Sequence, residues 1–135
     1  MVCIYCGYDT TVANSRVQKL SNNVWRRRKC RSCGAIFTSI EKPHYPANIV
    51  IFSEDGSLTP FLPEKLFLSV YGCLRHRQNP IEDAKNICDT ITRKIFANGV
   101  ADGKVKKAEL RNIIKVTLNR FDKTAMVHYQ AFHAK

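Results

Sequence analysis

The chain has 135 residues, enough for one ordinary domain or two small ones, and its 44% hydrophobic content allows a packed core and excludes wholesale disorder. The 22 Lys and Arg outnumber 11 Asp and Glu, and the formal net charge of +11 favours a polyanionic partner, first of all nucleic acid, over a protein that is merely soluble and basic. No apolar run approaches the roughly 20 residues that cross a bilayer, and no charged-then-apolar leader precedes the first cysteine, so we expect a cytoplasmic protein with no membrane partner.

Two Cys-x-x-Cys pairs, in CIYCG and CRSCG, lie in the first part of the chain. Each pair can present two thiolates to one ion, and the glycine after it (Gly7 or Gly34) lets the backbone turn sharply. Redox pairs or disulfides fit less well, because a redox Cys-x-x-Cys normally occurs once, beside a βαβ unit. We predict one zinc ion per chain, structural because four cysteines leave no coordination position for a catalytic water. The predicted ligands are Cys3, Cys6, Cys30 and Cys33.

The segments around the cysteine pairs are typical of short strands. β-Branched residues predict strands over 10–18 (TTVANSRVQ), 24–30 (VWRRRKC) and 35–42 (AIFTSIEK), with a turn at SNN. A core of about 45 residues is too small to be stable without a cross-link, and we assign that role to the metal. Trp25 is expected to anchor the small core of the hairpin, the alternative being that it stacks on a base.

A run of cations, WRRRKCR, surrounds the second cysteine pair. Arg26 and Arg28 should project from one face of the strand and Arg27 from the other. So small a ribbon cannot bury them, and phosphates would relieve their mutual repulsion, while arginine can also read guanine edges. We interpret the run as a nucleic-acid contact rather than a solvated charge run. The predicted DNA-binding residues are Arg16, Arg26, Arg27, Arg28, Lys29 and Arg31.

The composition changes near EKPHYPAN, where Pro43 and Pro46 disfavour helix and indicate a short stiff linker. After this linker, NIVIFSEDGSLTPF predicts a strand, a tight turn at Asp55-Gly56 and a second strand. The second part of the chain therefore begins with a small β-hairpin.

Helical periodicity then predicts four helices. Pro63 suits the first turn of the first helix, and Asn79-Pro80-Ile81-Glu82 has the pattern of a capping box that opens the second. Asn98-Gly99 should end the second helix, and the fourth should begin after Asp122. The predicted core positions are Leu66, Val70, Cys73, Leu74, Ile81, Ala84, Cys88, Ile91, Ile95, Leu110, Ile113, Ile114, Leu118, Ala125, Tyr129 and Phe132. The fold class is therefore α+β, a small β ribbon followed by a mainly helical part with a β-hairpin cap.

These motifs together resemble the NrdR family, bacterial repressors of ribonucleotide reductase genes that join an N-terminal zinc ribbon to an ATP-cone. The matching stretches of the ribbon are CIYCG, NSR, RRRKC, CRSCG and FTSIE. Those of the cone are DGSLTPFLPEKL and LNRFDKTAMVHYQAF. The four-cysteine frame is shared with many zinc ribbons, whereas the order of all these stretches is far more specific.

The resemblance implies a zinc-dependent, nucleotide-responsive DNA-binding repressor associated with the nucleoid. Residues 1–42 would form a DNA-binding zinc ribbon, 43–47 a linker, and 48–135 an ATP-cone-like domain for nucleotide binding and oligomerisation. The implied partners are operator boxes in double-stranded DNA, the effectors ATP and dATP, and further copies of the chain. A nucleotide that binds one assembly better than another would shift the population toward it, and only some assemblies would match the spacing of the operator.

One departure from the family concerns the nucleotide phosphates. The family has a V-x-K-R-D-G stretch whose Lys and Arg contact phosphates, and here the two cations are replaced by Ser53 and Glu54. The carboxylate of Glu54 would repel a triphosphate unless a metal ion such as Mg²⁺ lies between them. Lys65 of the EKL stretch is retained. The nucleotide-binding residues implied by the resemblance are Ile51, Ser53, Lys65, Arg75 and Arg77.

The alternative function is that of an RNA- or ribosome-associated zinc ribbon, with a degenerate cone used only for assembly, which would prefer single strands or A-form duplex. An enzyme is not expected, because the chain lacks a G-x-x-x-x-G-K-[ST] loop, a G-x-G-x-x-G stretch and a paired nucleophile and base.

Overall fold

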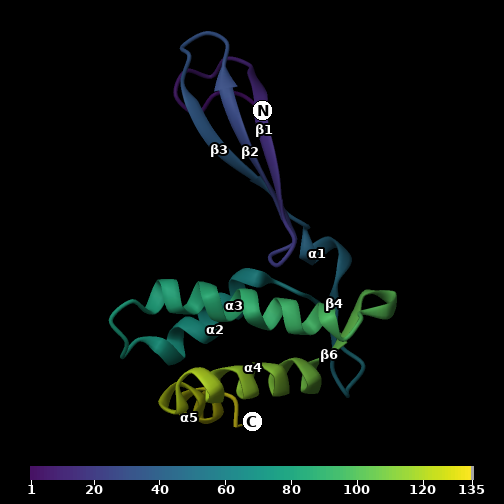
Figure 1. Ribbon diagram of the computed structural model, residues 1–135. Coiled ribbons are helices and arrows are strands. Elements are labelled where there is room, and N and C mark those ends of the chain that lie inside the picture. Colours follow the sequence, from purple (N-terminus) through teal and green to yellow (C-terminus); the bar gives the residue numbers. More distant parts are fainter. Residues whose placement is uncertain (135) are drawn as a thin grey trace. The chain divides into compact units, whose positions relative to one another are not determined.

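The computed structural model describes residues 1–134 and divides the chain into two compact units, Met1–Pro43 and His44 onward (Figure 1). The first unit is built of strands and the second is mainly helical with a small sheet, so the predicted α+β class is confirmed. The boundary between the units lies within the segment predicted as a linker. The last residues of that segment begin a one-turn helix, α1 (Tyr45–Asn48).

An antiparallel sheet of three strands in the order β1-β2-β3 forms the first unit. Its strands are β1 (Thr10–Gln18), β2 (Asn23–Cys30) and β3 (Ile36–Glu41), within a residue of the predicted bounds at each end. Among the described residues of this unit, only Cys3 and Cys30 are buried. The ribbon therefore has no hydrophobic core of its own, which agrees with its need for a cross-link.

The second unit contains a small sheet in the order β5-β4-β6. β4 (Val50–Phe52) and β5 (Leu58–Pro60) form the predicted hairpin, and Gly56 in its turn has a φ of 82°. β6 (Lys104–Lys106) pairs parallel to β4 and was not predicted, since three residues carry too short a pattern. Gly103, just before β6, must be glycine because a Cβ there would lie 2.5 Å from the backbone oxygen of Asn48.

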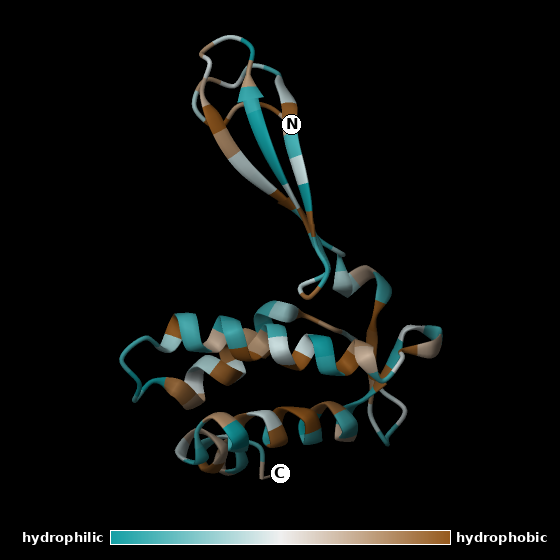
Figure 2. Ribbon diagram, viewed as in Figure 1, coloured by the Kyte–Doolittle hydropathy of each residue, from teal (hydrophilic) through white to brown (hydrophobic). Residues whose placement is uncertain are grey.

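All four predicted helices are confirmed. They are α2 (Pro63–Leu74), α3 (Pro80–Ala97), α4 (Lys107–Phe121) and α5 (Lys123–Phe132). α2 packs on α3 and α5, and α4 packs on α3 and α5. Hydrophobic and hydrophilic residues alternate along these helices, as expected of amphipathic helices around a shared core (Figure 2).

Most predicted core positions are buried, but two of them and the predicted helix cap need correction. Ile81 is 59% exposed, and Ile87, which was not predicted, is buried instead. Phe132 is 75% exposed, so the core face of α5 ends at Tyr129. The side chain of Asn79 makes no cap hydrogen bond, so the predicted capping box does not form, although the helix begins where it was expected. Cys73 is buried and Cys88 packs against the core, as predicted.

An ion-pair cluster joins the α2–α3 connection to the start of α5. Arg77 donates to Asp83 Oδ2 at 2.6 Å and to Asp122 Oδ2 at 3.1 Å, and its guanidinium lies 4.5 Å from the centroid of the Phe121 ring. Asp122 also accepts from His76 Nε2 at 2.9 Å and caps α5 through the backbone N–H of Ala125. The hydrogen bond from His76, helped by those from Ala125 and Arg77, lowers the pKa of Asp122 to about 2.

Substitution of Asp122 should destabilise the helical unit. Asp122→Ala removes both the charge and the cap and should lower the free energy of unfolding by about 3 kcal/mol. Asp122→Asn should cost less, because asparagine still caps the helix. Since the pKa of Asp122 is lowered by folding, its charge stabilises above pH 4, and that contribution disappears as the pH falls toward 2. Urea titrations at several pH values measure this, and a cost of Asp122→Asn that does not shrink in acid would contradict it.

Candidate functional site

The thiols of the two cysteine pairs converge on one point of the ribbon. The Sγ atoms of Cys3 and Cys33 lie 3.8 Å apart and those of Cys6 and Cys30 lie 3.5 Å apart, and all four lie within 4.8 Å of one another. A tetrahedron with Zn–S bonds of about 2.3 Å has S–S edges of about 3.8 Å. The number, type and spacing of these ligand atoms therefore fit one structural zinc ion.

Backbone groups around the thiols favour their thiolate forms. Cys30 Sγ accepts the N–H groups of Cys33 at 3.4 Å and Ser32 at 3.3 Å, and the bond from Cys33 is the largest cause of a pKa lowered to about 6. At Cys6 the N–H of Tyr8 lowers the pKa, but desolvation and the neighbouring thiols outweigh it and raise the pKa to about 12. A cation bound beside Cys6 would therefore favour its deprotonation.

One face of the ribbon sheet consists of three cross-strand rows, and we call it the open face. Its rows are Thr11, Lys29 and Ile36; Asn14, Arg27 and Thr38; and Arg16, Trp25 and Ile40. A β-bulge between Val12 and Asn14 creates this arrangement. Strict alternation from Thr10 would place Arg16 on the face of Arg28, whereas the extra residue brings Arg16 beside Trp25.

The cations of the two faces differ in their partners. In the part of the chain that the structure describes, the side chains of Arg16, Arg27 and Lys29 on the open face make no hydrogen bond or ion pair. On the opposite face, Arg26 pairs with Glu41 at 2.8 Å, and Arg28 donates to Ser39 at 2.9 Å. The open face therefore carries positive charge that no acidic side chain of the described residues pairs with.

Arg31 and Trp25 are the other two residues of the ribbon that the sequence singled out. Arg31 is exposed on the second cysteine turn, next to the ligand Cys30. Trp25 is 46% exposed, so the expectation that it anchors a core is wrong. It lies instead in a shallow hollow of the open face, lined also by Asn14, Arg16, Arg27 and Thr38.

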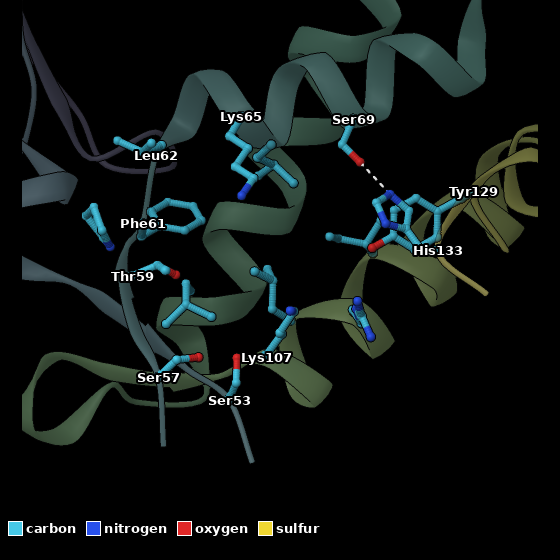
Figure 3. A pocket seen from close by; sticks show the side chains of 16 residues that line it. Ser53, Ser57, Thr59, Phe61, Leu62, Lys65, Ser69, Lys107, Tyr129 and His133 are labelled. Carbon is cyan, nitrogen blue, oxygen red and sulfur yellow. Dashed lines mark hydrogen bonds between the residues drawn. The ribbon is translucent and has the colours of Figure 1, made fainter. Parts of the chain in front are cut away.

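A pocket of about 330 Å³ lies in the second unit, between the small sheet and helices α2, α4 and α5 (Figure 3). Ser53, Thr59 and Phe61 line it from the sheet side, and Tyr129 and His133 line it from the end of the chain. Such a volume is at the lower end of the range for small-molecule sites.

The polar lining of the pocket is cationic and hydroxylic. Lys65 from α2 and Lys107 from α4 reach into it from two sides (Figure 3), and Arg111 also lines it. Among the described residues no Asp or Glu lines the pocket. Burial, then Arg111 and Lys107, lower the pKa of His133, whose Nε2 lies 3.0 Å from Ser69 Oγ.

The structure brings together only part of the nucleotide-binding set implied by the family resemblance. Ile51, Ser53 and Lys65 line the pocket, whereas Arg75 and Arg77 follow the end of α2, where Arg77 belongs to the ion-pair cluster. Two further cations of the pocket could have been found in the sequence, since KAELR places two cations four residues apart on one helix face. These are Lys107 and Arg111, and Glu54 does not line the pocket.

Within residues 1–134, no helix is both long enough and apolar enough to cross a membrane.

Comparison with known proteins gives concordant results for both units. A family model described as the N-terminal domain of NrdR-like transcriptional repressors matches residues 1–41. A protein named transcriptional repressor NrdR from Hyphomonas neptunium is 32% identical over 134 residues, which cover 98% of this chain and 82% of the relative. Proteins of the same name from Variovorax paradoxus and Rhodospirillum centenum are each 30% identical over 98% of this chain, covering 89% and 85% of their own lengths.

Proposed function

Because the chain belongs to the NrdR family of transcriptional repressors, we propose that it represses ribonucleotide reductase genes by binding operator DNA in a nucleotide-dependent manner. Residues 1–42 would act as the DNA-binding zinc ribbon, and 48–135 as the nucleotide-binding and oligomerisation domain. The open face of the ribbon is the observation that carries this proposal. It presents three cations whose side chains make no hydrogen bond or ion pair within the described residues, on a frame that the four-cysteine cluster can hold rigid.

Zinc would be held by Cys3, Cys6, Cys30 and Cys33. Its role would be structural, since the four thiolates complete a tetrahedron and leave no position for substrate. Bound in this way, Cys30 would fix the position of β2, which runs directly into it. The cations of that strand would thereby be held in place before DNA binds, which reduces the entropy that binding costs.

The six predicted cations would divide their roles in DNA binding. Arg16, Arg27 and Lys29 would contact phosphates or base edges directly, because no side chain among the described residues pairs with their charges. Arg26 and Arg28 would chiefly hold the sheet together through their bonds to Glu41 and Ser39. Arg31, on the exposed cysteine turn, would contact phosphate at the border of the interface.

The pocket of the second unit would bind ATP or dATP. α2 and α4 begin at the pocket without side-chain caps, and Lys65 and Lys107 lie in their first turns. A cation at a helix N-terminus is electrostatically unfavourable, whereas an anion there is stabilised by the helix dipole and by the lysines. Lys107 and Arg111 would thus supply the positive charge that the family has at the positions of Ser53 and Glu54. Mg²⁺ could bind with the nucleotide but would not be needed for this charge.

DNA binding is tested with two sets of variants. Arg16→Ala/Arg27→Ala/Lys29→Ala should lose most duplex binding, and the slope of log K against log salt should fall by nearly three. Arg26→Ala/Arg28→Ala is the matched control on the opposite face and should keep most of the slope. Fluorescence anisotropy with duplexes selected from a random-sequence pool measures both.

Two results of this experiment would count against the proposal. If the open-face variant bound as tightly as the wild type, the DNA interface would lie elsewhere. If the wild type preferred single-stranded RNA to duplex DNA at equal salt, the RNA-associated alternative would replace the repressor proposal.

A further inference from the structure

Trp25 occupies the middle strand of the open face, where its indole is 46% exposed. Its cross-strand neighbours are Arg16 on β1 and Ile40 on β3, and Ile40 is 54% exposed. The chain contains a single tryptophan. A half-exposed aromatic side chain beside Arg16 and Arg27, two cations whose side chains make no hydrogen bond or ion pair within the described residues, is a candidate contact for a ligand.

The hollow around the indole contains groups that can recognise a base. Asn14 and Thr38 offer an amide and a hydroxyl, and Arg16 and Arg27 offer guanidiniums. Asn, Thr and Arg side chains are the usual partners of base edges in the major groove, and apolar groups contact the thymine methyl. The hollow therefore combines hydrogen-bonding and apolar recognition, whereas phosphate binding alone needs only charge.

The open face also has dimensions that suit a duplex. Three strands about 4.8 Å apart place the outer strands about 10 Å from each other, within the width of about 12 Å of the major groove. Asp9 and Glu41 are the acidic residues of the first unit, and Glu41 lies on the opposite face in its pair with Arg26. Among the described residues of the face, none would repel the phosphates on either side of the groove.

We propose that Trp25 contacts bases in the major groove of duplex DNA and contributes sequence preference rather than charge. This inference rests on the proposed DNA binding by the ribbon and adds a base-contacting residue to it. Asn14 and Thr38, in the adjacent row, are placed to contact the edge of a neighbouring base. An uncharged contact of this kind releases no counterions, so it changes affinity without changing the salt dependence.

The native fluorescence of Trp25 provides the test. Titration of the full-length zinc-bound protein with duplex selected from a random-sequence pool should quench its emission and shift it to shorter wavelength. Trp25→Ala should weaken binding to the selected duplex about 10-fold, with less effect on unselected duplex and an unchanged salt slope. Trp25→Phe, which keeps an aromatic ring, should retain part of the preference for the selected duplex. It also keeps the test valid if the alanine variant does not fold.

The control moves the fluorophore to the opposite face. Val12 pairs with Arg28 and is 43% exposed, close to the exposure of Trp25. In Val12→Trp/Trp25→Phe, the emission should change little when duplex binds. Duplex binding with unaltered Trp25 emission and full affinity of Trp25→Ala would overturn this inference while leaving the proposed function intact, and absence of duplex binding would overturn both. Stronger quenching and tighter binding with single-stranded DNA than with duplex would also overturn it, because the contact would then be stacking on unpaired bases.

Discussion

Chelation of zinc is expected to unfold the ribbon and abolish DNA binding, while the helical unit stays folded. Among the described residues of the ribbon only Cys3 and Cys30 are buried. Hydrophobic burial therefore offsets almost none of the conformational entropy that the backbone loses on folding. Structural zinc in comparable small modules is worth about 10–16 kcal/mol of folding free energy. The second unit has its own core of buried aliphatic residues and should keep its helical circular dichroism.

The measurement follows zinc release, proteolysis and duplex binding together during titration with a chelator. Protease should cut within residues 1–43 as zinc is released, and added zinc should restore both protection and binding. Cys6→Ser should reproduce the loss, whereas Cys88→Ser, a thiol outside the cluster, should retain one zinc per chain. A ribbon that stayed protected and bound duplex after stoichiometric zinc release would refute the structural role of the metal.

Sequence patterns predicted the strands and helices well, because each depends on local periodicity. The strand bounds over 10–18 and the helix start at Pro63 agree with the structure. Features that depend on pairing between distant segments were not predicted. β6 becomes a strand only because it lies beside β4, and Ile87 is buried in place of Ile81 because of how α3 packs on its neighbours.

In the candidate sites, too, residues within one local motif could be predicted from the sequence, whereas residues brought together by the fold could not. The four cysteines could be assigned from spacing alone, because each pair is a local turn that presents two thiolates. The face of the sheet on which Arg16 lies could not be predicted, because one extra residue in β1 moves its side chain to the other face. Lys107 and Arg111 are more than forty positions after Lys65 in the sequence, and only the packing of α2 and α4 on α3 and α5 places all three on one pocket.

Loss of Lys107 and Arg111, the two cations of α4 that line the pocket, should abolish the response to nucleotide. Charge-assisted hydrogen bonds contribute about 1.5–3 kcal/mol each, so Lys107→Ala/Arg111→Ala should weaken ATP and dATP binding at least about 100-fold. Calorimetry measures the affinity, and light scattering measures whether nucleotide still changes the oligomer size. Arg75→Ala is the control, since Arg75 lies outside the pocket and should bind nucleotide normally. Loss of binding in that control instead would move the phosphate site to the other end of α2.

The same two substitutions, which should weaken nucleotide binding, should not destabilise the ligand-free protein. Lys107 is the first residue of α4, where its charge opposes the helix dipole, and it shares the pocket with Lys65 and Arg111. Its removal should therefore leave the melting temperature unchanged or raise it slightly, while the increase caused by ATP disappears. Inorganic tripolyphosphate should stabilise the wild type but not the variant, which separates phosphate contacts from contacts to the base. A variant that is destabilised without ligand would indicate that Lys107 and Arg111 hold the fold together rather than bind the anion.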